Sequence, residues 1–344
     1  MTLRLGTRRS ALATAQSAQV AKAITDATGT PVELVPIVSE GDVSRASLSQ
    51  IGGTGVFATR LREALAAGEC DLLVHSLKDL PTQPAPGLSI AAVPPRADAR
   101  DIVATRGPAL IELGEAAEVG TGSPRRIAQL RRRAPRATPR DIRGNVESRL
   151  GRVRDGELAA VVLAAAGLAR AGIIELPAPG ETLAAGSEDW AGLRFEALGL
   201  AEWPTAAGQG ALAVEIREDA SEDVRAAVSV LEHEATRIAV TIERSLLAGL
   251  EAGCHSPVGV HAVVDGDEVR VRAVVYGVGH ADRVGLDLTE SLTQGYIQGS
   301  GDGEGANVAD SADPTARAAL IGSAIARRLL EEGAADLVSR ESAS

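Results

Sequence analysis

Predicted strands and helices alternate along the first half of this chain, and this succession constrains the fold more than any other feature. We expect helices at 10–27 and 56–67, the first of them with Ser10 as its N-cap. Apolar runs that predict strands stand at 3–6, 32–38, 71–75, 88–93 and 101–104. Alternation of this kind is typical of layered α/β domains.

A second α/β unit begins after a proline-containing segment at 94–100, which we expect to be a first crossing between two lobes. A second crossing at 203–210 returns the chain, so that a strand at 211–216 rejoins the first unit. Two crossing segments predict a hinge between the lobes. Within the second unit we expect helices from near Ser123 and at 145–153 and 164–171, strands ending near 122 and at 158–163 and 195–200, and a loop at 177–190.

The pattern changes near residue 226 and predicts a small α+β domain. We expect a long helix at 232–250, three strands near 258–264, 268–276 and 283–288, and a last helix at 314–331. The segment 298–313 is rich in Gly, Asp and Ser, a composition that favours a mobile loop. The predicted domains are 1–96 with 205–225, then 97–204, then 226–344.

Composition narrows the class of protein. Hydrophobic residues make up 45% of the 344 residues but aromatic residues only 2%, so Ala, Val, Leu and Ile must build the core. The net charge of −11 argues against a general binder of nucleic acid or anionic membranes. No apolar stretch approaches the roughly 18 residues of a transmembrane helix, and residues 2–9 are too polar for a signal peptide.

The number and spacing of the cysteines indicate neither disulfides nor a zinc site. Cys70 and Cys254 are the only cysteines and lie far apart, which is no disulfide framework, and no Cys/His spacing suits zinc. We therefore expect a cytoplasmic protein without a metal.

Lys78 and Asp79 stand where a predicted strand ends, just before Pro81. In open α/β sheets, ligands collect at the carboxyl ends of the strands. Lys78 is one of only two lysines, with Lys22, among 35 basic residues. An N-cap or a solvated turn would also explain the Lys-Asp pair.

Arginines gather at three predicted strand-to-helix junctions. The loop 120–126 (GTGSPRR) is Gly-rich and opens a helix, where N–H groups and the helix dipole attract anions. Its Arg125 and Arg126 add donors that pair bidentately with carboxylate or phosphate. The other arginine-bearing positions are Arg8 and Arg9 before Ser10, Arg143 before Gly144, and the helical Arg149 and Arg170.

These junctions predict a cleft for a ligand with several carboxylates or phosphates. The absence of a GxxxxGK[ST] run disfavours a P-loop nucleotide site. The arginines at 131–140 are interpreted as a solvated face, with a nucleic-acid patch as the weaker alternative because of the net charge.

Cys254 lies in the segment GCHSP at 253–257, after the long predicted helix. Three interpretations stay open from composition alone: an inert buried cysteine, a nucleophile paired with His255, or a covalent attachment point. Adjacent residues rarely face each other, which disfavours the dyad.

Several segments, taken in order and with their spacings, closely resemble the porphobilinogen deaminase (hydroxymethylbilane synthase) family from Leu3 to about Pro257. They are 5–10 (LGTRRS), 74–81 (VHSLKDLP), 120–126, 143–146 (RGNV), 208–210 (GQG) and 253–254 (GC). The resemblance implies an α/β fold of two lobes like type II periplasmic binding proteins, joined by a two-strand hinge, plus a small α+β C-terminal domain.

The resemblance also implies an activity. The family adds four porphobilinogens in turn to a dipyrromethane cofactor, releasing ammonia each time, and then hydrolyses off the linear tetrapyrrole hydroxymethylbilane. Cys254 matches the cysteine that carries the cofactor through a thioether. No nucleic-acid or membrane partner is implied, and the family is usually monomeric.

Site residues carry over by position. Asp79 matches the catalytic aspartate, which stabilises the azafulvene cation left by loss of ammonia and shuttles protons; Lys78 would help to keep it ionised. The residues implied to hold the cofactor are Cys254, Lys78, Ser123, Arg125, Arg126, Arg143 and Gly144. Those implied to bind substrate are Arg8, Ser10, Arg149, Arg170 and Phe57.

Two positions depart from the family pattern, and the one at Thr54 matters for the site. The loop 51–57 matches the family's lid, but Thr54 stands where a lysine is usual, so a contact to substrate carboxylate is missing or weakened. His255 also differs from the usual residue and has no assigned role.

A hypothesis of another class is a non-catalytic, two-lobed polycarboxylate-binding protein, which would need no cysteine at position 254.

Overall fold

The computed structural model describes residues 1–37, 56–176, 183–186, 188–251, 256–277, 282–293 and 313–339. The chain divides into two compact units. The first comprises Met1–Ala97 and Ala211–Arg237, and the second comprises Asp98–Gly210 and Ile238–Ser344. The finer division into three domains at the expected bounds stays a prediction.

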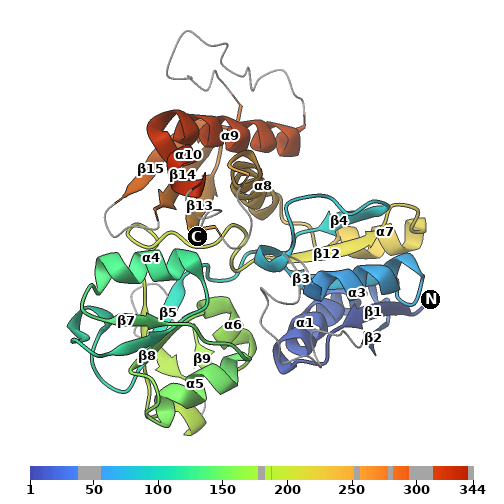
Figure 1. Ribbon diagram of the computed structural model, residues 1–344. Coiled ribbons are helices and arrows are strands. Elements are labelled where there is room, and N and C mark those ends of the chain that lie inside the picture. Colours follow the sequence, from blue (N-terminus) through green and yellow to red (C-terminus); the bar gives the residue numbers. More distant parts are fainter. Residues whose placement is uncertain are drawn as a thin grey trace. The chain divides into compact units, whose positions relative to one another are not determined.

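The first unit contains a five-stranded sheet (Figure 1). Its strands, in spatial order, are β2 (Val32–Pro36), β1 (Leu3–Thr7), β3 (Leu72–Ser76), β12 (Leu212–Arg217) and β4 (Leu88–Ala92). Strand β1 runs parallel to β2 and β3, whereas β12 is antiparallel to both β3 and β4. The expectation that the strand at 211–216 rejoins the first unit is confirmed.

Helices cover both faces of this sheet. Helices α1 (Ala11–Thr28) and α7 (Glu222–Ser229) share one apolar cluster with β1, β3 and β12, and α3 (Val56–Ala66) packs on the other face through Leu61 and Leu65. The predicted N-cap of α1 is confirmed, since Ser10 Oγ accepts a hydrogen bond from Ala13 N (3.3 Å). Helix α7 was not predicted.

The second unit also contains a five-stranded mixed sheet. In spatial order its strands are β11 (Arg194–Ala197), β5 (Asp101–Thr105), β8 (Ala160–Ala164), β6 (Glu118–Gly120) and β7 (Thr138–Arg140). Strand β6 is parallel to β7 and β8, and β5 is antiparallel to β8 and β11.

Helices cover both faces of this second sheet as well. Helix α4 (Pro124–Arg133) packs on one face, while α5 (Val146–Arg154) and α6 (Ala165–Arg170) pack on the other (Figure 1). Side chains alternate along β5, so Ile102 and Ala104 face α5 and α6, whereas Val103 faces α4. By the same alternation Asp101 also lies on the face of α4.

The rest of the second unit is an antiparallel three-stranded sheet, β13 (Val258–Asp265), β14 (Glu268–Tyr276) and β15 (Arg283–Ser291). It shares one apolar cluster with α8 (Glu234–Gly249) and α9 (Pro314–Leu329). These helices cross closely: a Cβ at Gly322 would lie 2.3 Å from the Ile242 carbonyl oxygen. Helix α10 (Ala335–Ser339) follows.

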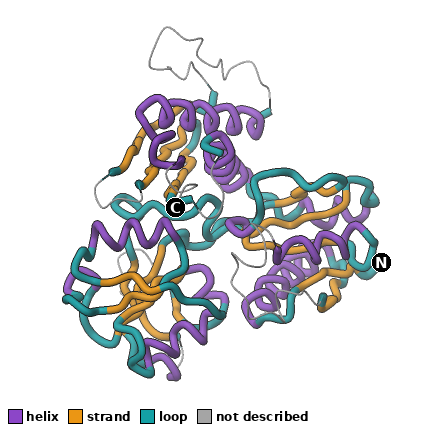
Figure 2. Tube along the Cα trace, in the orientation of Figure 1, coloured by secondary structure: helices purple, strands orange, loops and turns teal. Residues whose placement is uncertain are grey.

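The predicted α/β class is confirmed, and in both units helices lie outside the strands (Figure 2). In the expected loop at 177–190 the described residues form two short elements, β10 (Ala184–Ala185), paired with β9 (Ile174–Glu175), and the 3-10 turn Glu188–Trp190. The segment 298–312 lies outside the described residues. Among the described helices, none combines the length and apolar content that a bilayer crossing requires.

Candidate functional site

Asp79 ends a short 3-10 turn, Leu77–Asp79, directly after β3. The backbone of this turn is fixed, because Leu77 N donates to Ala211 O (3.0 Å) and Leu80 N donates to Leu77 O (3.2 Å). Leu77 and Leu80 are buried, whereas Lys78 is half-buried and Asp79 is exposed. The N-cap of the turn is Ser76, so the N-cap interpretation of Asp79 is wrong.

A buried polar pair holds α1 against the strand that leads to this turn. Gln16 Nε2 donates to Ser76 Oγ (2.9 Å), and Ser17 Oγ donates to Thr7 Oγ1 (2.9 Å). Gln16 and Ser17 are both buried. No sequence pattern indicated these contacts, which fix the carboxyl ends of β1 and β3 relative to α1.

Arg8 and Ser10 lie in the loop between β1 and α1. The carbonyl oxygen of the half-buried Arg8 accepts hydrogen bonds from the hydroxyls of Thr7 (3.3 Å) and Thr14 (3.4 Å). Since Ser10 Oγ caps α1, its local role is structural; the expected contact of either side chain with substrate stays a prediction.

On the opposite face of β3, a buried carboxylate joins three elements of the first unit. Glu215 on β12 accepts hydrogen bonds from Arg62 Nε (3.0 Å) and Nη2 (2.8 Å) on α3, and lies 3.2 Å from His75 Nε2 on β3. Burial alone would raise the pKa of Glu215, but the hydrogen bonds from His75 and Arg62 hold it below its ordinary value. This cluster anchors α3.

In the second unit, the Gly-rich loop enters α4 as predicted, with Ser123 as N-cap and Pro124 in the first turn. The Ser123 side chain makes no capping hydrogen bond; instead Ser123 N donates to Thr121 Oγ1 (3.3 Å). A Cβ at Gly122 would lie 2.8 Å from Asp141 Oδ1 and 3.2 Å from the Ile142 carbonyl oxygen, so the loop passes close to the chain at 141–142. The hydroxyl of Ser123 is thus not used by the helix.

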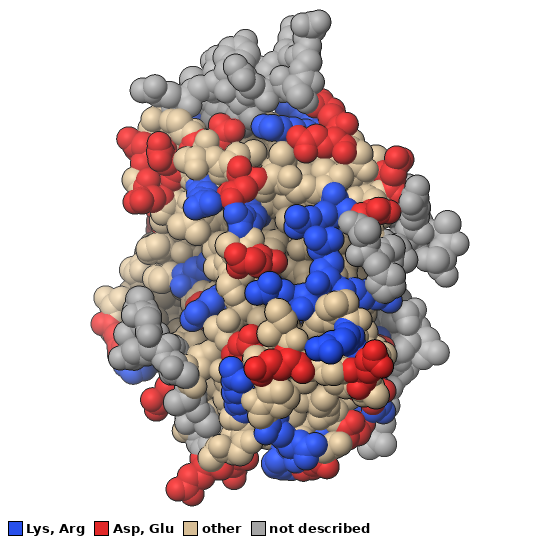
Figure 3. Space-filling model, turned by 90° about the vertical axis from the view of Figure 1, so that its left-hand side faces the viewer, with Lys and Arg blue, Asp and Glu red and all other residues tan. Residues whose placement is uncertain are grey.

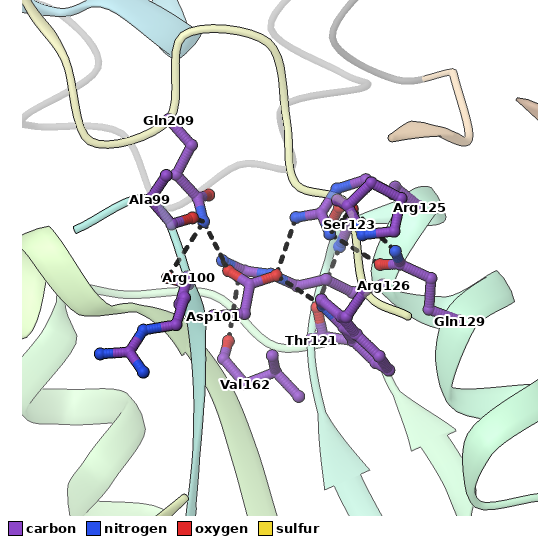
Figure 4. A network of polar contacts seen from close by, with 12 residues as sticks. Ala99, Arg100, Asp101, Thr121, Ser123, Arg125, Arg126, Gln129, Val162 and Gln209 are labelled. Atoms are coloured by element: carbon purple, nitrogen blue, oxygen red, sulfur yellow. Dashed lines mark hydrogen bonds and ion pairs between the residues drawn. The ribbon is translucent and has the colours of Figure 1, made fainter. Parts of the chain in front are cut away.

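Arg125 and Arg126 point inward to Asp101 (Figure 4). Arg126 donates from Nε to Oδ2 (3.1 Å) and from Nη2 to Oδ1 (2.6 Å), and Arg125 donates from Nη2 to Oδ2 (3.0 Å). All three side chains are buried, with Asp101 fully inaccessible. No sequence pattern indicated this pairing, and the expected contact of the arginines with cofactor carboxylates stays a prediction.

Two neutral donors complete the shell around Asp101. Trp203 Nε1 donates to Oδ2 (2.8 Å), and Gln209 Nε2 donates to Oδ1 (2.8 Å). Burial would raise the pKa of Asp101, but Arg126 and Arg125 outweigh it and hold the pKa far below its usual range. Burial lowers the pKa of Arg125.

Gln209 also bonds one crossing segment to the other, because its Nε2 donates to the carbonyl oxygens of Ala99 (2.8 Å) and Arg100 (3.3 Å). Next to it, Gly208 N donates to Glu243 Oε2 (2.7 Å), and Ala262 N donates to Glu243 Oε1 (2.8 Å). The buried Glu243 therefore ties the second crossing to β13.

The third junction opens α5. Asn145 caps this helix, since Ser148 N donates to Asn145 Oδ1 (2.8 Å). Gly144 has φ +113°, and a Cβ there would lie 2.2 Å from Ser148 Oγ, so glycine is required. Arg143 is exposed, and Arg149 on α5 is half-buried.

Arg170 is the last residue of α6. Its Nη2 donates to Gly210 O (2.9 Å) on the second crossing. Burial lowers the pKa of Arg170 to about 10. Among the described residues, its Nε is buried without a hydrogen-bond partner, as is Arg125 Nε.

The exposed arginines of the second unit are interspersed with acidic side chains (Figure 3). Arg140 pairs with Glu118 (2.9 Å) and Glu157 (3.3 Å), and Arg270 pairs with Asp287 (3.0 Å). Arg132, Arg133 and Arg136 are also exposed, which agrees with the predicted solvated face at 131–140.

Some predicted site residues lie outside the described part of the chain. These are Cys254 and the side chain of Phe57. His255 and the lid residues 51–55, with Thr54, also lie outside it. Within the described ranges, no group of three or more His, Cys, Asp or Glu side chains is placed to hold a metal.

Known proteins resemble this chain over most of its length. A family model described as "Porphobilinogen deaminase, dipyromethane cofactor binding domain" matches residues 3–225, and "Porphobilinogen deaminase, C-terminal domain" matches 237–289. "Porphobilinogen deaminase" of Leifsonia xyli subsp. xyli is 47% identical, covering 97% of this chain and 94% of the relative. "Porphobilinogen deaminase 1" of Streptomyces coelicolor is 46% identical, covering 98% and 97%.

Solved structures with a similar trace include the VFT2 domain of Bordetella pertussis BvgS, at 16% identity and a TM-score of 0.38, covering 67% of this chain and 86% of that one. A Salmonella typhimurium periplasmic binding protein with high arginine specificity has 14% identity and a TM-score of 0.38, covering 67% and 91%.

The first family model covers the segments that contain Asp79, Arg125 and Arg143, and the relatives match over nearly the full length of the chain. The chain belongs to the porphobilinogen deaminase family, the transferases of porphyrin biosynthesis that carry a dipyrromethane cofactor.

Proposed function

We propose that this chain condenses four porphobilinogen molecules head to tail onto a covalently bound dipyrromethane. Each addition releases ammonia, and hydrolysis then frees hydroxymethylbilane. The observation that carries this proposal is the exposed Asp79 beside Lys78 at the carboxyl end of β3, in a chain of this family. Family membership favours this enzyme over a non-catalytic polycarboxylate-binding protein.

The charges of the second unit fit a ligand with several carboxylates. Porphobilinogen carries an acetate and a propionate, so both the cofactor and the growing chain are polyanions. Buried cationic groups are stabilised by an anionic partner. Arg125 and Arg170 each keep a buried Nε without a hydrogen-bond partner among the described residues, and the Asp101 cluster holds two guanidinium groups against one carboxylate.

Asp79 is proposed as the catalytic residue. Positive charge develops on the substrate pyrrole as its amine leaves, and an ionised carboxylate near the ring nitrogen stabilises that charge. The same carboxylate can accept and return a proton at successive steps. The fixed backbone of the turn Leu77–Asp79 keeps this group in place from one addition to the next.

The remaining side chains are proposed to bind carboxylates. When bound, the dipyrromethane supplies the nucleophilic pyrrole carbon to which the first substrate is joined. The groups proposed to hold the cofactor are Lys78, Ser123, Arg125, Arg126, Arg143 and Gly144. Those proposed to bind substrate are Arg8, Ser10, Arg149, Arg170 and Phe57. Ser123 has a hydroxyl that α4 does not use.

Cys254 is proposed to carry the cofactor through a thioether, and intact mass spectrometry tests this directly. We expect wild-type protein to show the mass excess of one dipyrromethane and Cys254→Ala to lack it. Cys70→Ala is the matched control, because Cys70 is fully buried and burial raises the pKa of its thiol to about 11. It should keep the full mass excess and turn over porphobilinogen.

Two results would count against the proposal. Wild-type protein without the mass excess that still bound polycarboxylates would favour the binding protein. A mass excess that persisted in Cys254→Ala would place the attachment elsewhere. We also propose that the chain acts as a cytoplasmic monomer. Its net charge of −11 supports the absence of a nucleic-acid or membrane partner.

A further inference from the structure

One buried carboxylate in the second unit organises five hydrogen bonds. Asp101 accepts two from Arg126 and one each from Arg125, Trp203 and Gln209, at 2.6 to 3.1 Å (Figure 4). Its side chain is fully inaccessible. A buried carboxylate with so many donors has a single favourable position, so the donors are fixed by it as well.

The charges in this cluster do not cancel. Two guanidinium groups share one carboxylate, so a buried positive charge is left over. Arg126 donates to Asp101 and to Val162 O (2.9 Å). Arg125 also donates from Nη1 to Gln129 Oε1 (2.7 Å) and Pro204 O (3.3 Å), and its Nε has no partner among the described residues.

The surplus positive charge of the cluster lies at the N-terminal end of α4. Arg125 and Arg126 stand in the first turn of α4, next to the unused hydroxyl of Ser123 and the N–H groups at the start of the helix. A carboxylate arriving at this end of α4 meets the helix dipole and the surplus charge together. Without Asp101, two uncompensated cations would repel each other beneath the same turn.

We propose that Asp101 is a positioning residue for cofactor retention: it fixes Arg125 and Arg126 and leaves one net positive charge beneath the start of α4. The inference rests on the proposed function, because the ligand is the polycarboxylate cofactor. Asp101 itself is too deeply buried to contact a ligand. Trp203 and Gln209, from the second crossing, donate hydrogen bonds that hold the carboxylate in place beneath α4.

The test compares Asp101→Asn with Asp98→Asn in the full chain. Asp98 is also an aspartate paired with an arginine, Arg100 (2.6 Å), but it lies outside the cluster. The readout is the fraction of folded chains that carry the dipyrromethane mass. In Asp101→Asn we expect this fraction to drop by about tenfold or more, because the free energy of one hydrogen bond to an ionised group corresponds to about a tenfold change in affinity. In Asp98→Asn we expect no change in the fraction.

A double variant separates positioning from a general structural role. If Asp101 acts through the arginines, Asp101→Asn/Arg126→Gln should carry cofactor at a level within about twofold of the worse single variant, since coupled sites are not additive. Fully additive losses would overturn the proposal. So would wild-type cofactor occupancy in Asp101→Asn.

If Asp101→Asn does not fold, cofactor occupancy is measured in Trp203→Phe instead. This variant removes one hydrogen-bond donor to Asp101 and keeps an aromatic ring in the core. Lowered cofactor occupancy in that variant supports the proposal, and wild-type occupancy overturns it. Wild-type protein without any dipyrromethane mass would instead contradict the proposed function, so the two failures are distinguishable.

Discussion

Arg62 and Glu215 form a bidentate ion pair, with Nε and Nη2 of the arginine both within 3.0 Å of a carboxylate that is almost fully buried. We expect Glu215→Gln to destabilise the first unit by about 3 kcal/mol, since breaking a buried pair leaves a charge without its partner. Urea unfolding measures this free energy. Glu69→Gln, in an exposed pair with Arg60, is the control and should change it by less than about 1 kcal/mol.

The same carboxylate predicts a pH dependence. The folded pKa of Glu215 is lowered from 4.5, so the stabilisation it contributes is fully present above pH 4.5 and is lost as the pH falls through the folded value. The difference in unfolding free energy between wild type and Glu215→Gln should therefore shrink below pH 4.5. A difference that grew on acidification would contradict the assignment.

Asp79→Asn tests the catalytic carboxylate without changing its size. Because the backbone of the 3-10 turn is held by Leu77 and Leu80, the variant should fold, keep its cofactor and bind porphobilinogen. Its kcat should fall by about 10²–10⁴-fold, since proton transfer and charge stabilisation are lost. Asp219→Asn, at an exposed residue, is the control. Full turnover in Asp79→Asn would remove Asp79 from the mechanism.

Gly144→Ala tests the third arginine junction. The added Cβ meets Ser148 Oγ at 2.2 Å in a left-handed conformation, so the loop must move and carry Arg143 with it. We expect a loss of stability of about 1–3 kcal/mol and a raised KM for porphobilinogen. Gly172→Ala is matched, with φ +69° and open space around it, and should lower stability without raising KM.

Local signals predicted much of the scaffold. The predicted N-cap Ser10 is confirmed, and the helix expected from 145 begins at Val146, one residue later. The apolar runs that became β3, β8 and β12 lie within two residues of their expected bounds. The arginine junctions and the strand end before Asp79 are also where the sequence placed them. Such features depend on neighbouring residues, so a sequence pattern carries them.

The Asp101 cluster could not be predicted in the same way. Its members, Arg125, Trp203 and Gln209, are 24 to 108 residues away from Asp101 along the chain, and only the fold brings them together. An aspartate at the start of an otherwise apolar strand was the one available signal. Glu215 gave a similar signal in β12, and each was missed because its partners come from other elements.

The place of β12 between β3 and β4 affects how the chain is made. Among the described strands, β4 pairs with β12 alone, so it leaves the ribosome before the strand that completes its pairing exists. All five strands of the sheet that carries Asp101 are synthesised in between. Because domains fold as units during synthesis, that sheet can form completely before the sheet of the first unit does. The scaffold of Asp79 is then finished late, and a chain truncated before Leu212 would expose the edges of β3 and β4 to aggregation.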